Sequence, residues 1–188
     1  MSKKSSTLST LDYLMFFYLL VFFAAVSAVM CQSSDQGAGS IGVCNGRLGS
    51  DLPPEQEVVE FYKTTGIKRM RIYDPNQATL TALQGSGIEL VLDVPNVDLE
   101  SLQSDATNWV QTNVVQYFPA TRIRYIAVGN EVDPEKQETS RFVPLVLPAM
   151  QSIYRALSQF GLQDQIKVST ATYSALLANT YPPSNAIF

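Results

Sequence analysis

The stretch 88–94, IELVLDV, decides the fold class because its apolar residues do not alternate with polar ones. Leu90, Val91 and Leu92 follow one another, whereas a strand with one face in water alternates with a period of two residues. An unbroken apolar run is typical of a strand that is covered on both faces in a parallel sheet. The stretch therefore predicts a parallel β-sheet.

Working outward, segments with helical spacing of apolar residues separate this run from similar runs. Pro54 opens the first such segment, acidic residues follow in its first turn, and Gly66 follows its end, as in a helix. The other β-rich runs are 40–43, 68–73, 123–128 and 166–171. This regular alternation predicts βαβ units and an α/β fold.

Two architectures share this alternation, an open doubly wound sheet and a closed (β/α)8 barrel of the TIM type. The glycine pattern at 41–49, IGVCNGRLG, is not followed by a helix where a dinucleotide-binding fingerprint needs one, and this favours the barrel. A complete barrel takes about 250 residues, or roughly 30 per unit. Residues 40–188 are therefore expected to hold about the first five β/α units.

Residues 1–39 are expected to be a signal peptide and pro-segment, and residues 40–188 the partial barrel domain. Lys3 and Lys4 precede the apolar run 14–30, which becomes rich in small residues before the polar stretch 32–40. This is the order of a secretory signal peptide. An uncleaved membrane anchor is the alternative, because the run nearly reaches the length of about 20 residues that a span needs. Cleavage predicts a secreted protein without a stable membrane anchor.

The amino-acid composition excludes several kinds of functional site. The chain is 46% hydrophobic and 16% charged with a net charge of −4, which is typical of a globular domain and gives no basis for nucleic-acid binding. It has no histidine, which excludes Ser-His-Asp and Cys-His catalysis and the usual zinc sites. No metal or other cofactor is expected. Cys31 lies in the expected leader, and Cys44 is interpreted as a small buried residue rather than a reactive thiol.

Acid–base chemistry must then come from other groups, and three carboxylates lie in or just after expected strands. Catalytic groups of such barrels lie at the C-terminal ends of strands. Asp74 is expected to cap the next helix, and Asp93 to be structural or to orient a neighbour. Glu131 follows Asn130 at the end of its strand and is the candidate catalytic acid, with a solvated loop acid as the alternative. Carboxylates, amides and aromatic rings are also the groups that recognise sugars.

Five blocks in this order resemble the plant endo-1,3-β-glucanases of glycoside hydrolase family 17. They are IGVCNGRLGSDLPP (41–54), RMRIYDPN (69–76), LVLDVPN (90–96), IAVGNEV (126–132) and IKVSTATYSALLANTYPPSNAIF (166–188). The resemblance implies a (β/α)8 barrel and a retaining hydrolase of β-1,3-glucan. It also implies that Glu131 is the general acid/base and that Asn130, Tyr73 and Asn96 bind substrate.

The chain departs from the family pattern in two places. Asn45 replaces the tyrosine of the usual VCYG block. The glutamate nucleophile, in a segment resembling SESGWP, is absent, although a retaining glycosidase needs two carboxyls about 5–5.5 Å apart. Asp164 is the single acid after Glu138, and it is expected at the opposite end of the barrel.

We therefore expect a family member that does not hydrolyse glucan as an isolated chain. A non-catalytic β-glucan-binding fragment and a non-functional truncated product are the alternatives. The open edges of the partial sheet predict self-association or poor stability. The acidic balance resembles that of family members secreted to the cell wall space, and roles in plant defence, callose turnover and growth all stay open.

Overall fold

The structure, a computed structural model, describes residues 41–177 and 181–185. The expected leader, 1–39, lies outside the described residues, and so does its predicted cleavage. None of the helices in the described ranges is both long and apolar enough to cross a membrane.

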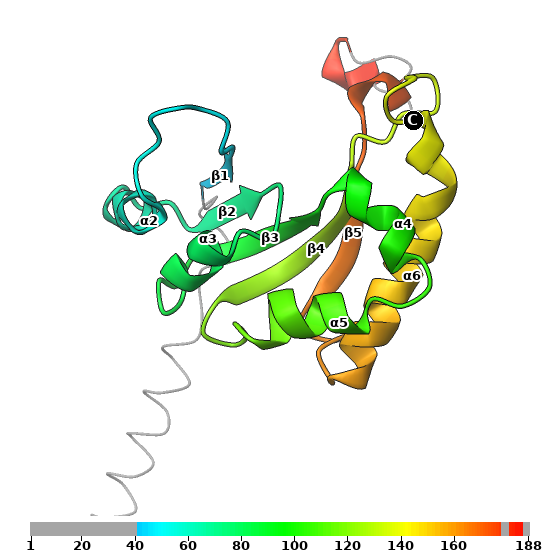
Figure 1. Ribbon diagram of the computed structural model, residues 1–188. Helices are drawn as coiled ribbons and strands as arrows, with labels where there is room; N and C mark the ends of the chain where they lie inside the picture. Colours follow the sequence, from blue (N-terminus) through cyan, green and yellow to red (C-terminus); the bar gives the residue numbers. More distant parts are fainter. Residues whose placement is uncertain (1–40, 178–180, 186–188) are drawn as a thin grey trace, which may run out of the picture. The chain divides into compact units, whose positions relative to one another are not determined.

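The described strands form one parallel sheet in the order of the chain (Figure 1). Each strand pairs in parallel with the next, so that Leu90 lies between Met70 and Ile123. The strands are β1 (Gly42–Asn45), β2 (Arg69–Ile72), β3 (Glu89–Val94), β4 (Arg122–Asn130) and β5 (Lys167–Ala171). The predicted parallel α/β fold is confirmed.

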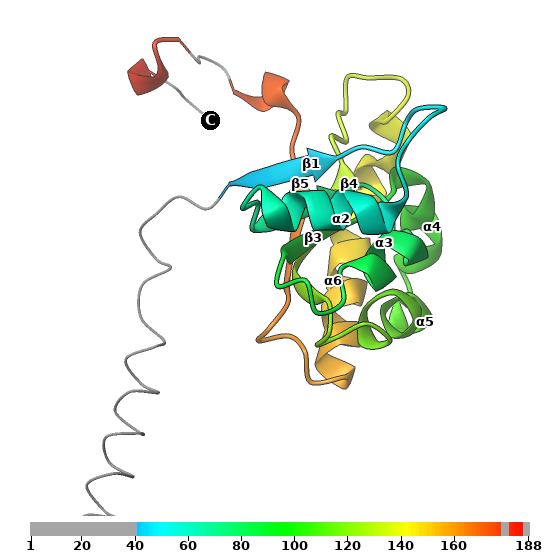
Figure 2. The ribbon, with the colours of Figure 1, turned by 90° about the vertical axis from the view of Figure 1, so that its left-hand side faces the viewer.

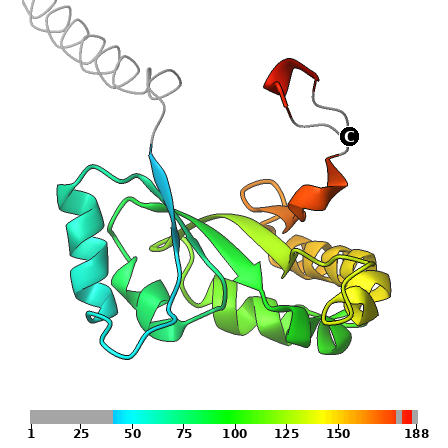
Figure 3. The same cartoon turned by 90° about the horizontal axis from the view of Figure 1, so that it is seen from above.

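Helices cover one face of this sheet. Figures 2 and 3 show α2, α3, α5 and α6 on the same side of the strands. The helices are α2 (Glu55–Thr64), α3 (Gln77–Ala82), α4 (Leu99–Leu102), α5 (Thr107–Val110) and α6 (Val143–Gln159). Shorter turns are η1 (Asn96–Asp98), the π-helical η2 (Gln111–Val115), η3 (Ser140–Phe142), η4 (Ser174–Leu176) and η5 (Pro183–Asn185).

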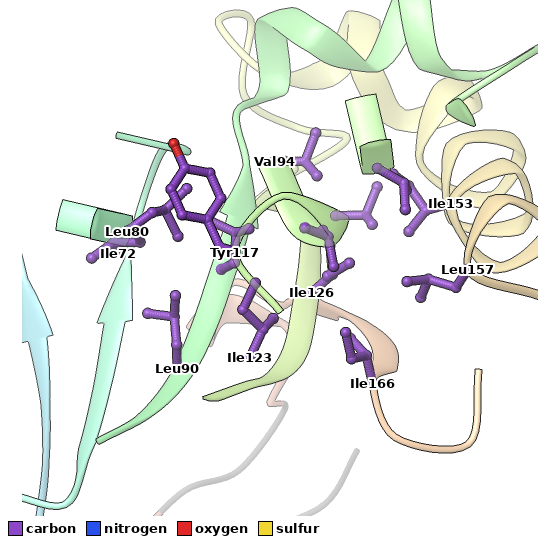
Figure 4. Close-up of a cluster of buried hydrophobic side chains, with 14 of the residues drawn as sticks. Ile72, Leu80, Leu90, Val94, Tyr117, Ile123, Ile126, Ile153, Leu157 and Ile166 are labelled. Atoms are coloured by element: carbon purple, nitrogen blue, oxygen red, sulfur yellow. The ribbon is translucent and has the colours of Figure 1, made fainter. Parts of the chain in front are cut away.

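The hydrophobic core lies between the sheet and these helices (Figure 4). Its fully buried side chains come from the strands and the helices alike: Ile72, Leu90, Ile123, Ile126, Leu80, Ile153 and Leu157. Because side chains alternate along a strand, a slip of one residue would turn the whole apolar set away from the core. The core therefore fixes the register of the strands, and the register determines which residues meet at the strand ends.

The second face of the sheet carries polar side chains, in contrast to the expectation that both faces are covered. Arg71 and Asp93 meet there, Arg69 meets Glu89, and Tyr125 is 49% exposed. Asp93 interrupts the apolar run of β3 on this face, where it is fully buried and accepts hydrogen bonds from Arg71. The apolar run of β3 therefore indicated the parallel sheet correctly, and in the described part of the chain helices cover one face of that sheet.

Two local expectations are wrong. Strand β1 begins later than expected, so Cys44 lies within it, and its side chain is exposed rather than buried. Asn76, not Asp74, caps α3, because the Asn76 side chain accepts a hydrogen bond of 2.9 Å from the backbone N–H of Thr79.

Candidate active site at the ends of β2, β3 and β4

Glu131 follows the last residue of β4 and has an unusual backbone conformation. Its φ is 47°, the one positive value of a non-glycine residue in the described part of the chain. The left-handed region costs an L-residue about 1–2 kcal/mol, and such residues cluster at functional sites. Its N–H donates to the carbonyl of Ala171 over 2.9 Å, and its side chain is exposed. The end of β5 therefore holds the turn that presents this carboxylate.

A β-bulge precedes Glu131. Ala127 pairs with Ser169 and Asn130 with Ala171, so β4 has one more residue than β5 in this interval. Gly129 lies inside the bulge with φ 76°. A Cβ at this position would lie 3.2 Å from Oδ1 of Asn96. The bulge redirects the chain, as bulges beside active sites commonly do, and glycine allows Asn96 to approach closely.

The Asn96 side chain forms hydrogen bonds with both the N–H and the carbonyl of Asn130. Its Nδ2 donates to the Asn130 carbonyl over 2.9 Å, and its Oδ1 accepts from the Asn130 N–H over 2.8 Å. Asn96 follows β3 directly after Pro95, so this double contact ties the end of β3 to the end of β4. The substrate contact expected of Asn96 stays a prediction, and the structure gives the residue a backbone-holding position.

The Asn130 side chain contacts an arginine that sequence reasoning missed. Arg71 Nη2 lies 2.7 Å from Asn130 Oδ1, and Arg71 Nε lies 3.0 and 3.1 Å from the two carboxylate oxygens of Asp93. Asp93 is fully buried. Its role fits the expectation that it orients a neighbour. The sequence offered one indication of this contact, because Arg71 and Asp93 are charged residues inside neighbouring strands. Only the register of the strands shows that the two side chains meet.

Arg71 and Asp93 each stabilise the charged form of the other. Burial raises the pKa of Asp93, and the hydrogen bonds from Arg71 act in the opposite direction. The hydrogen bond to Asp93 raises the pKa of Arg71, so the guanidinium stays protonated. Asn130 therefore faces a permanent cation that is fixed by a buried acid.

Tyr73 lies beside the same arginine. The Arg71 guanidinium is 4.7 Å from the centre of the Tyr73 ring, and the tyrosine is 39% exposed. A hydrogen bond with Cys44 raises the pKa of Tyr73, and burial adds to the effect. Of the predicted site residues, the structure thus brings Asn96, Asn130 and Glu131 together directly, and it connects Tyr73 to them through Arg71.

Asn45, where the chain departs from the family pattern, lies at the end of β1. Its Oδ1 accepts a hydrogen bond of 2.8 Å from the Tyr62 hydroxyl. It also lines a cavity of about 410 Å³ with apolar residues of the following loop, among them Leu52 and Pro53. Burial raises the pKa of Tyr62, and the charge of Glu55 adds to it. Asn45 is thus held by α2, which leaves a partly polar cavity beside the first strand.

Metal ligands do not gather in the described residues: no group of three or more His, Cys, Asp and Glu side chains could hold an ion there. The parallel sheet belongs to the α/β class that includes β/α barrels, and the candidate site residues lie at the C-terminal ends of its strands. Comparison with known families identifies the family. The family model "Glycosyl hydrolases family 17" matches residues 41–188, and the chain belongs to this family.

Relatives agree with this assignment. The chain is 50% identical over 173 residues to the "Glucan endo-1,3-beta-glucosidase, acidic isoform GI9" of Nicotiana tabacum, covering 91% of this chain and 50% of that protein. It is 57% identical over 155 residues to a "Glucan endo-1,3-beta-glucosidase" of Vitis vinifera, covering 81% of this chain and 45% of that protein. The chain thus spans about half the length of these curated relatives.

Solved structures share the fold. CJP38, described as a beta-1,3-glucanase and allergen of Cryptomeria japonica pollen, matches with a TM-score of 0.75 and 39% identity, over 79% of this chain and 47% of that one. One chain from a study of two plant beta-glucan endohydrolases with distinct substrate specificities matches with a TM-score of 0.69 and 40% identity, over the same shares. The expected barrel-type fold and the family resemblance are confirmed.

Proposed function

We propose that this chain is the acid/base-bearing part of a barrel that binds and hydrolyses β-1,3-glucan. The observation that supports this most directly is the left-handed turn at Glu131, which places an exposed carboxylate beside Asn130 at the end of β4. The matched relatives are named for glucan endo-1,3-beta-glucosidase activity. A plain solvated loop acid would have no need for a strained backbone that three neighbouring strands hold in place.

In the proposed mechanism, Glu131 is first a general acid and then a general base. It protonates the glycosidic oxygen as the bond to the anomeric carbon breaks, and it later takes a proton from the water that releases the glycosyl intermediate. Asn130 hydrogen-bonds the sugar at the cleavage point, and Tyr73 lines the cleft. A second carboxylate, about 5–5.5 Å from the carboxyl group of Glu131, must attack the anomeric carbon.

Three other acids near the ends of these strands have partners of their own. Asp93 is buried against Arg71. Asp74 lies 3.5 Å from Arg47, and Asp133 is buried, with Oδ1 accepting the Glu135 N–H over 2.9 Å. Residues 41–188 contain no stretch like the family's SESGWP segment, which supports the proposal for the isolated chain. We therefore propose that the isolated chain binds β-1,3-glucan without hydrolysing it.

Reducing-sugar release from laminarin and binding of laminaritetraose test this proposal together. The purified chain is expected to release no reducing sugar, and both it and its Glu131→Gln variant are expected to bind the oligosaccharide. Release that Glu131→Gln abolishes would contradict the proposed inactivity and support the role of Glu131. Failure of both proteins to bind would contradict glucan recognition.

We further propose that the protein is secreted to the cell wall space. The order of charged, apolar and small residues in 1–39 supports this, as does the acidic balance of the chain. A fluorescent reporter that carries residues 1–39 is expected in the extracellular fluid of plant cells. Retention of the full-length reporter in a membrane fraction would favour an uncleaved anchor.

A further inference from the structure

The orientation of the Asn130 amide follows from the chemistry of its partner. An arginine guanidinium can only donate hydrogen bonds. The amide atom that lies 2.7 Å from Arg71 Nη2 must therefore be the oxygen of Asn130 and not its nitrogen. The usual ambiguity between the two ends of an asparagine amide is thereby removed.

Asp93 fixes the arginine in turn. Its carboxylate accepts from both Nε and Nη2 of Arg71, which is the two-point geometry that holds a guanidinium in one plane. The Asp93 side chain is fully buried and the Arg71 side chain is 22% exposed. Because the three residues lie on neighbouring strands β2, β3 and β4, rotation of Asn130 would break a contact that the sheet itself positions.

The nitrogen end of the amide is consequently left for a ligand. No hydrogen bond joins Asn130 Nδ2 to any residue of the described ranges, and this atom is not among their buried unsatisfied groups. The backbone N–H and carbonyl of Asn130 are both held by Asn96. Asn130 can thus neither turn its side chain nor shift its backbone without losing these contacts.

We infer that Arg71 is a positioning residue that makes Asn130 present only N–H donors, so that the ligand group it recognises is an acceptor oxygen such as a sugar hydroxyl. The sugar part of this inference rests on the proposed function. The orientation of the amide does not, and it can be measured without a ligand. The guanidinium also withdraws electron density from the amide, which strengthens its N–H groups as donors.

A ligand-free test compares two arginines of the same strand. Arg71→Met is expected to shift the side-chain ¹³Cγ and NH₂ signals of Asn130 in the labelled protein, because the oxygen loses its charged partner. Arg69→Met is the matched control, since Arg69 lies two residues earlier on β2 and pairs with Glu89 instead. Signals of Asn130 that stay at the wild-type position in Arg71→Met would overturn the inference.

A second variant leaves the Arg71–Asp93 pair intact. Asn130→Asp keeps an oxygen toward Arg71 but replaces the outward donor with an acceptor. We expect its affinity for laminaritetraose to fall at least about tenfold, because the sugar oxygen that accepts from the amide would have to reverse its role and donate to the carboxylate. Affinity equal to that of the wild type would overturn the donor assignment. Absence of binding by the wild type itself would instead contradict the proposed function, while the ligand-free comparison still decides the role of Arg71.

Discussion

The turn 129–131 combines strained backbone conformations with hydrogen bonds from a residue that is distant in the sequence. Gly129 and Glu131 both have positive φ, and Asn96 holds the peptide groups of the residue between them. The sequence predicted the carboxylate and its amide neighbour, because a polar pair at the end of an apolar run stands out. It could not predict the Asn96 contact or the Arg71 contact, because both depend on the register between strands that are far apart in sequence.

Glu131→Gly tests the strain at the proposed catalytic residue. Glycine adopts the left-handed region freely, whereas alanine pays the same steric cost as glutamate. We expect the free energy of unfolding of Glu131→Gly to exceed that of Glu131→Ala by about 1 kcal/mol in urea titrations. Equal stability of the two variants would show that the turn is not strained.

Gly129→Ala tests the close approach of Asn96. The new Cβ would lie 3.2 Å from Asn96 Oδ1, so it would weaken the hydrogen bond to the Asn130 N–H in addition to its backbone cost. Gly66→Ala is the control, because Gly66 has φ 78° and a methyl group at its position would have nothing within 4 Å. Gly129→Ala is expected to lose about 1 kcal/mol more than Gly66→Ala in urea unfolding. A smaller loss at Gly129 would contradict the proposed packing.

At the scale of the elements, the opposite ends of the strands carry a separate charge network. Glu89 at the start of β3 accepts hydrogen bonds from Arg69, Arg122 and Arg124, and a bulge in β4 supplies the last of these. Burial alone would raise the pKa of Glu89, but the hydrogen bonds and charges of the arginines outweigh it and lower the pKa. This network lies at the end of a barrel that serves stability rather than catalysis.

The lowered pKa gives a pH dependence of known sign. The folded protein binds the Glu89 proton less readily than the unfolded chain, so the stabilisation is complete above the ordinary value of 4.5 and is lost as the pH falls through the lowered pKa. Glu89→Gln is expected to lower the free energy of unfolding by about 1 kcal/mol near pH 7. The difference from the wild type should vanish in strongly acidic urea titrations, and a difference that grows on acidification would contradict this.

The positions of the strands were largely predictable from local sequence patterns, whereas the solvent exposure of their side chains was not. The runs that became β2 to β5 match the structure closely, because apolar spacing and proline or glycine boundaries are local signals. The exposure of Cys44 and the polar second face of the sheet depend on what packs against each strand. The apolar run around Cys44 therefore indicated a strand correctly, but the expected burial of Cys44 was wrong.

At the scale of the whole domain, an apolar surface lies at the β5 edge. Leu147 and Tyr154 on α6 are 62% and 52% exposed, and with Met150 and Val168 they line a cavity of about 540 Å³. The strand order places β1 and β5 at the two edges of the described sheet. Exposed strand edges beside apolar side chains favour association between chains.

Self-association is accordingly expected to involve this surface. Leu147→Lys should lower the average molar mass that light scattering reports at high protein concentration, because a lysine cannot be buried there without cost. Leu48→Lys is the control, since Leu48 is fully exposed in the loop before α2. A monodisperse wild-type monomer would contradict the expected association.

The most direct test of the proposed glucan site is a titration of the ¹⁵N-labelled chain with laminaritetraose, with cellotetraose as the control sugar. The proposed site predicts shifts of the backbone amide signals of Asn130 and Glu131 and of the Tyr73 signals with the 1,3-linked sugar, and much smaller changes with the 1,4-linked one. Unchanged signals at the ends of β2 and β4, or shifts confined to the Glu89 network or to the β5 edge, would contradict it.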